Sequence, residues 1–190
     1  MSTGVLIFLG VLVLALIYGI TLYNGLVQLK HNVAKAWANI DVLLKQRHDE
    51  LPKLIEVCEQ YKQFEQTTLT QVIAARNQVH AAREGQDVAA LGRAEGALRS
   101  GLGRLFAVAE AYPELRADEN FMQLQRRISQ LETGLTDRRE FYNDAVNLNN
   151  IRVQQFPDAV IAGLFRFGEA PLLEFSAAEK TDVDVKALFS

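Results

Sequence analysis

This sequence has little cysteine, little proline and a small net charge. The single cysteine, Cys58, has no intrachain partner, so the 190-residue chain is not a disulfide scaffold. Only 4 prolines and 12 glycines exclude collagen-like and low-complexity chains, and 49% hydrophobic residues exclude disorder over most of the length. The net charge of −3 argues against a dedicated nucleic-acid-binding protein, whose domains are usually basic.

Charged residues are missing altogether before Lys30, and most of that stretch is strongly apolar. The 18 residues from Val5 to Leu22 are interrupted only by glycine and one threonine. With Tyr23 they would form a helix of roughly 28 Å, close to the bilayer hydrocarbon core of about 30 Å. The pattern predicts a short tail at 1–4 and a single transmembrane helix at 5–23. A cleaved signal peptide is the alternative, but the basic start and the small-x-small cleavage site that it needs are missing.

The residues that flank the apolar run predict its orientation. Lys30 and Lys35 follow the run and no basic residue precedes it. The positive-inside rule therefore places the bulk of the protein in the cytoplasm and the short N-terminus outside, with a bulk on the other side of the membrane as the alternative. Tyr23 fits the aromatic belt, so Tyr23, Lys30 and Lys35 are the expected membrane-interface residues.

The pattern after the run is mainly helical, and no strand alternation of convincing length is found. Heptad-like apolar spacing predicts a helix over 24–83, with a kink near 48–51 because Pro52 lies inside it. Asp87 and Asp118 are expected to cap helices over 87–110 and 119–155, and a short helix is expected over 158–164. The predicted fold is all-α: the transmembrane helix continues into an antiparallel bundle of three long helices and a short one, similar to a four-helix bundle. The bundle domain is predicted at 24–175, and 176–190 as a flexible tail. A straight first long helix would leave an apolar seam for another chain, and a bent one would complete a four-helix packing.

Polar residues interrupt the apolar seams of these helices. They are the candidate buried register residues: Arg47, Glu65, Arg138, Asn149 and Arg152. A buried charge needs a partner, and such residues often fix helix register. We expect Glu65 to pair with an arginine of the third long helix. The alternative is that helix rotation exposes these side chains.

Catalytic patterns are missing from the chain. None of His31, His48 and His80 has the spacing of a zinc or di-iron site, and Cys58 occupies a core position where a free thiol packs as a small apolar group. We therefore expect no catalytic, cofactor-binding or metal-binding residues, no cofactor and no nucleic-acid partner.

Several stretches together resemble one known family. They are YNGLV at 23–27, AWANIDVLLKQRHDELPKLIEV at 36–57, AAR at 74–76, EAYPELRADENFMQL at 110–124 and RREFYNDAVNLNNIRVQQFP at 138–157. In this order and spacing they are similar to the LemA family of bacterial membrane-anchored helical proteins. The resemblance implies one N-terminal span, a helical bundle and a place in the bacterial cytoplasmic membrane, and it transfers no catalytic residue.

The predicted function is a non-enzymatic, membrane-anchored scaffold or adaptor. It would present a coiled-coil-like helical surface to protein partners or to a second copy of itself. The alternative is a membrane-active or lipid-organising protein, which would bind anionic bilayers through Lys30, Lys35 and the phenylalanine-rich stretch 165–175.

Overall fold

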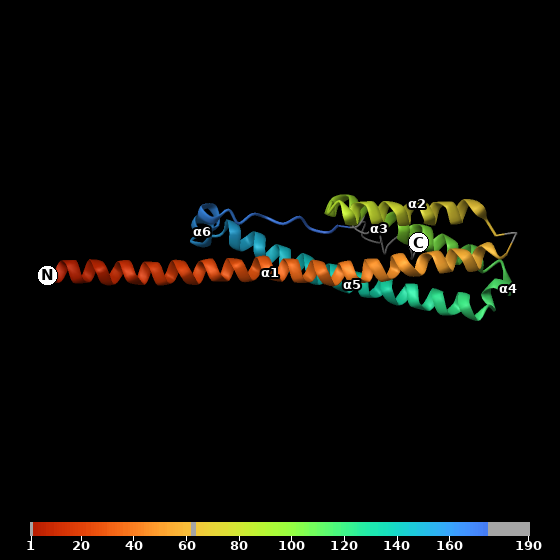
Figure 1. Ribbon diagram of the computed structural model, residues 1–190, viewed down its shortest axis with the longest axis horizontal. Helices are drawn as coiled ribbons and strands as arrows, with labels where there is room; N and C mark the ends of the chain where they lie inside the picture. Colours follow the sequence, from red (N-terminus) through yellow and green to blue (C-terminus); the bar gives the residue numbers. More distant parts are fainter. Residues whose placement is uncertain (1, 62–63, 175–190) are drawn as a thin grey trace, which may run out of the picture. The chain divides into compact units, whose positions relative to one another are not determined.

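The computed structural model describes residues 2–61 and 64–174, and within them the chain forms helices and no strand. Six helices follow one another along the chain (Figure 1). Their bounds are α1 Thr3–Glu59, α2 Gln66–Glu84, α3 Val88–Ala109, α4 Pro113–Arg116, α5 Glu119–Gln154 and α6 Asp158–Phe165. The all-helical class predicted from the sequence is therefore confirmed for the described residues. The tail predicted at 176–190, and Phe175 before it, lie outside them.

The chain divides into two compact units. The first comprises Met1–Asn39 and Glu140–Leu172, and the second comprises Ile40–Arg139 and Leu173–Ser190. Because α1 and α5 each contribute to both, the unit boundaries fall inside helices rather than in linkers. Each unit has its own buried side chains and is described by itself.

The second unit buries one apolar stripe from each of α1, α2, α3 and α5. The fully buried side chains of this core include Ile40, Leu44, Leu51, Leu54, Leu69, Leu91, Leu98, Leu105 and Ile128. Asp87 and Asp118 cap α3 and α5 as expected, since their carboxylates accept the N–H groups of Ala90 and Phe121 at 2.8 and 3.0 Å. Both helices end within one residue of their predicted bounds.

The predicted single helix over 24–83 is wrong, because the chain leaves the helix after Glu59 and α2 begins at Gln66. No glycine or proline marks this turn. Phe64 is buried there, and its ring lies 5.4 Å from that of Tyr112. The helix break therefore coincides with the burial of an aromatic side chain and not with a helix-breaking residue. Such burial depends on tertiary packing, so the local sequence does not predict the break.

Pro52 does not end α1, which continues for two turns beyond it. A proline leaves the carbonyl four residues earlier without its helical N–H donor. Here that carbonyl belongs to His48, and Arg76 of α2 donates to it from Nε at 3.1 Å. A side chain from the neighbouring helix thus satisfies the acceptor that the proline orphans.

The first unit contains the start of α1, the end of α5, and α6. Leu26, Tyr142, Val146 and Ala162 are buried in it. The Trp37 ring lies 5.6 Å from that of Tyr142, whose hydroxyl donates to the carbonyl of Pro171 at 2.9 Å. This core holds the two helices and the segment after α6 together around residues 26–37 of α1.

Candidate functional site

The apolar start of α1 has the properties of a membrane span. It is the one helix in residues 2–61 and 64–174 that is long and apolar enough to cross a bilayer, with a mean hydropathy of 2.8 over its best window and none of that window buried. Nothing in the described chain covers its leucine, isoleucine and phenylalanine side chains, which are about half exposed. A run of this kind is stable in lipid rather than in water.

The three expected interface residues follow this run on α1. Tyr23, Lys30 and Lys35 are all exposed. Tyr23 also has neighbours that the sequence did not predict: the rings of Phe165 and Phe167 lie 4.8 and 5.6 Å from its ring, both nearly edge-on. The residues just past the apolar run are therefore packed against the end of α6 (Figure 1).

Asn149 is buried, and its role is to hold the backbone that follows α6. Its amide donates to the carbonyl of Gly168 at 3.2 Å. The next residue, Asn150, exchanges two hydrogen bonds of 2.9 Å with the backbone of Ala170. Asn150 was not predicted as a site residue, although its place beside Asn149 in the stretch NLNN was the available signal.

Arg152 is half-buried and pairs with an acid that the sequence analysis also missed. Its Nη2 lies 2.5 Å from Oδ1 of Asp158, a carboxylate that is almost completely buried at the start of α6. The guanidinium also lies against Gly25 of α1, where an added Cβ would be 3.5 Å from Nη2. Arg152 therefore joins α5, α6 and α1 within the first unit.

Arg47 lies in the core of the second unit and bridges two acids from other helices. Its guanidinium pairs with Glu95 of α3 and, at 2.7 Å, with Glu132 of α5. Arg99 lies 3.5 Å from the other oxygen of Glu132. Burial raises the pKa of Glu95 and the adjacent Arg47 opposes that rise.

The other two candidate register residues are exposed, which corrects their prediction as buried groups. Glu65 precedes α2 and accepts a 3.0 Å hydrogen bond from the Thr68 hydroxyl, and its pairing with an arginine of the third long helix stays a prediction. Arg138 is exposed on α5. Glu65 falls in the turn between α1 and α2, where the heptad pattern assumed a continuous helix.

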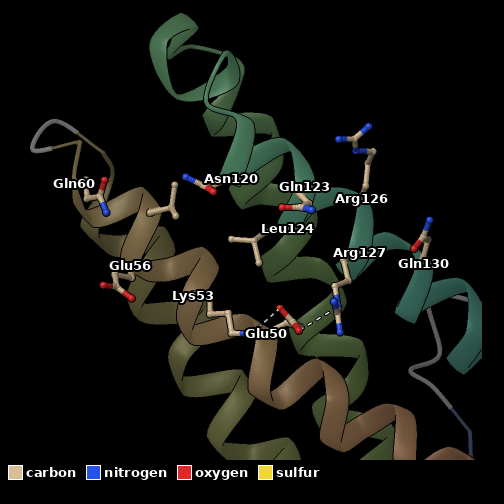
Figure 2. Close-up of a pocket in the computed structure, with 11 residues that line it drawn as sticks. Glu50, Lys53, Glu56, Gln60, Asn120, Gln123, Leu124, Arg126, Arg127 and Gln130 are labelled. Atoms are coloured by element: carbon tan, nitrogen blue, oxygen red, sulfur yellow. Dashed lines mark hydrogen bonds and ion pairs between the residues drawn. The ribbon is translucent and has the colours of Figure 1, made fainter.

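A polar groove lies between α1 and α5 in the second unit (Figure 2). It measures about 890 Å³ and is lined by Glu50, Lys53, Glu56, Val57, Gln60, Asn120, Gln123, Leu124, Arg126, Arg127 and Gln130. The nearly buried carboxylate of Glu50 lies 3.2 Å from Lys53 and 3.1 Å from Arg127. Amides and paired charges at this spacing are suited to binding a polar surface through many hydrogen bonds.

Cys58 and the histidines are the residues that could act as a nucleophile or as metal ligands. Cys58 is buried, and desolvation raises the pKa of its thiol to about 12, which keeps it protonated. In the part of the chain that the structure describes, no three His, Cys, Asp or Glu side chains are grouped to hold a metal ion. His48 and His80 stack with ring centroids 4.6 Å apart.

Comparison with known proteins adds two relatives. Magnetosome proteins MamQ 2 and MamQ 1 of Paramagnetospirillum magneticum are each 29% identical to this chain over 96 residues. That stretch covers 50% of this chain and 35% of each relative, so the similarity spans only about a third of their length.

The described helices and the exposed apolar run define a membrane-associated helical protein with one candidate N-terminal span. Residues 36–187 match the model of the LemA family. Since this is most of the chain, the protein belongs to the LemA family.

Proposed function

We propose that this LemA-family protein is a non-enzymatic, membrane-anchored scaffold or adaptor. Its apolar run anchors it in the bacterial cytoplasmic membrane, with a short N-terminus outside and the helical bulk in the cytoplasm. The bulk offers a helical surface to a protein partner or to a second copy of the chain. The supporting orientation signal is the pair Lys30 and Lys35 after the run.

One observation carries this proposal: α1 is a single helix from the apolar run into the core of the second unit. It begins at Thr3, contains the whole run and ends at Glu59 after contributing Leu44, Leu51 and Leu54 to the core. The helix that would lie in lipid, α1, thus also contributes to the core of the second unit. Confinement to a membrane raises the effective concentration of such a body for other membrane-bound proteins.

The groove between α1 and α5 is the surface that we assign to the partner. Its lining alternates acids, bases and amides, and Leu124 supplies an apolar contact near its centre (Figure 2). A helix with charged and amide side chains matches this chemistry, because rim charges steer association and amides accept or donate hydrogen bonds. The nearly buried Glu50, paired with Lys53 and Arg127, forms the floor of the groove.

Site-specific photo-crosslinking in living cells tests the assignment. A photoreactive residue at Gln123, in the groove, is compared with one at Arg93, an exposed position on α3. We expect a discrete crosslinked product from position 123 and not from position 93. Two differently tagged copies of the chain then distinguish self-association from a different partner. Equal products at both positions, or none at position 123, would contradict the assignment of the groove.

A further inference from the structure

The last described helix, α6, has an apolar face that is largely exposed in the described chain. Asp158 and Ala162 face inward and are buried. Phe156, two residues before α6, and Val160, Leu164 and Phe165 within it are 79%, 60%, 72% and 54% exposed, and we call these four side chains the α6 apolar face. Transfer of such side chains from water to an apolar environment is favourable.

Two contacts fix α6 at one level along α1. Phe165 packs edge-on against Tyr23, the residue directly after the run Val5–Leu22. Asp158, at the other end of α6, bonds to Arg152, which lies against Gly25. Both ends of α6 are therefore held within about one helical turn, 5.4 Å, of the end of the apolar run.

Cations follow at the next level. Lys30 and Arg166 are exposed and line a pocket of about 260 Å³ together with Val33, Asn149 and residues 167–170. Lys30 lies seven residues past Tyr23, or roughly 10 Å along the helix. The one acid of this pocket, Glu169, accepts a 2.8 Å hydrogen bond from Gln154. Along α1 the apolar run is followed first by the aromatic rings and then by the cations. This order matches that of a bilayer, in which the acyl chains are followed by the interface and then by the phosphates.

We propose that α6 lies in the membrane interface, with its apolar face inserted among the phospholipids of one leaflet. Lys30 and Arg166 then face the lipid phosphates. The occupant of this surface is a phospholipid, because α6 is continuous with the level at which α1 would leave the hydrocarbon. The inference rests on the membrane anchor of the proposed function and adds to it a second, shallow contact with lipid that needs no protein partner.

Depth-dependent quenching in nanodiscs tests this with the full chain. Single cysteines carrying an environment-sensitive fluorophore are placed at Val160 and Leu164 on the α6 apolar face. Asp144, exposed on α5, is the control in water, and Val11, inside the run, is the control in the hydrocarbon. The native Cys58 is buried and can remain. The quenchers are phosphatidylcholines with a nitroxide either high on the acyl chain or near its end.

We expect blue-shifted emission at positions 160 and 164 and loss of their emission with the shallow quencher. Position 11 should respond to the deep quencher and position 144 to neither. If position 11 responds while 160 and 164 behave like 144, the α6 proposal is overturned and the anchor stands. If 160 and 164 are blue-shifted but not quenched, protein covers the face and the lipid assignment is wrong. If position 11 does not respond, the anchor fails and the α6 proposal with it.

The role of the cations is tested separately with phosphatidylglycerol. Adding this anionic lipid should strengthen quenching at position 164 in the otherwise unchanged chain. The double variant Lys30→Gln/Arg166→Gln should lose most of that increase, and Lys45→Gln, which removes an exposed cation of the second unit, should keep it. An increase that survives in the double variant would remove Lys30 and Arg166 from the proposal.

Discussion

At the scale of single residues, Gly92 of α3 is where the absence of a side chain matters most. An added Cβ would overlap the backbone carbonyl oxygen of Glu174, whereas at Gly103 of the same helix it would meet nothing within 4 Å. The residue before Glu174, Leu173, is buried. Gly92 therefore permits the close approach of the segment at 173–174 rather than simply weakening its helix.

The pair of glycines gives a matched prediction. Gly103→Ala should stabilise the protein by about 1 kcal/mol, the helix propensity gain of alanine over glycine. Gly92→Ala should destabilise it, because overpacking costs about 1–3 kcal/mol and displaces Leu173. Thermal unfolding of the detergent-solubilised chain, followed by circular dichroism, measures both. A Gly92→Ala protein as stable as Gly103→Ala would show that the segment at 173–174 does not lie against α3.

Arg47 is the residue whose loss should be most costly. Arg47→Met leaves the buried Glu95 without its cation, and breaking a buried pair in this way typically costs about 3–5 kcal/mol. Arg47→Met/Glu95→Leu removes both charges and should recover a large part of that stability. Urea denaturation of the two variants and the parent chain makes the comparison. The idea fails if the double variant is no more stable than the single one.

At the scale of elements, the joint between α1 and α2 depends on an uncharged His48. Its Nε2 lies 2.7 Å from Nη2 of Arg76, so the ring must accept a hydrogen bond there. Burial, and after it the charges of Arg76 and His80, lowers the pKa of His48, while Asp49 opposes this. His80 in turn lies 3.5 Å from Glu84.

The sign of the resulting pH dependence follows from proton linkage. Since the pKa of His48 is lower in the folded chain than in the unfolded chain, acidification protonates His48 first in the unfolded chain. Stability is complete above the unfolded pKa of about 6.5 and declines as the pH falls below it. The melting temperature should therefore drop on mild acidification, and less so in His48→Gln. His31→Gln, at an exposed position, should behave like the parent; an unchanged acid response in His48→Gln would exclude His48 as the cause.

The elements also show what could be predicted from sequence. α3 and α5 were predictable because each has a side-chain cap and an apolar stripe of helical period. The end of α1 at Glu59 and the start of α2 at Gln66 were not, since no glycine or proline marks them, and the buried Phe64 before α2 contacts Tyr112, a residue nearly 50 positions away. The same error made Glu65 look like a buried register position. Arg47 could be predicted as a buried charge because it interrupts an apolar stripe of its helix. Its partners Glu95 and Glu132 could not be predicted, because the pairing depends on how α1, α3 and α5 face one another.

The groove and the surface of α6 lay beyond sequence reasoning for a related reason. Glu50, Lys53 and Arg127 are unremarkable charges on their own helices, and only the pairing of α1 with α5 assembles them. Phe165 was predicted to supply apolar surface, but its contact with Tyr23 joins residues 142 positions apart. Side chains on separate helices form a site only after the helices have packed.

At the scale of the whole molecule, the prediction concerns the side of the membrane. With Ser2→Cys, an impermeant maleimide should label intact spheroplasts, and with Gln123→Cys it should label only after permeabilisation. The native Cys58 should stay unlabelled in both, since it is buried and its pKa is raised to about 12. The reverse pattern would place the bulk of the protein outside the cytoplasm.

The order of elements along α1 has a consequence for biosynthesis. Arg47 and its partner Glu132 are 85 residues apart, so at roughly 5–20 residues per second the ribosome needs several seconds to supply the second after the first. By then the apolar run has long been translated and is available to the insertion machinery. If the run inserts as proposed, the nascent chain is tethered before Arg47 can meet Glu132, and this part of the core can close only after α5 has been translated.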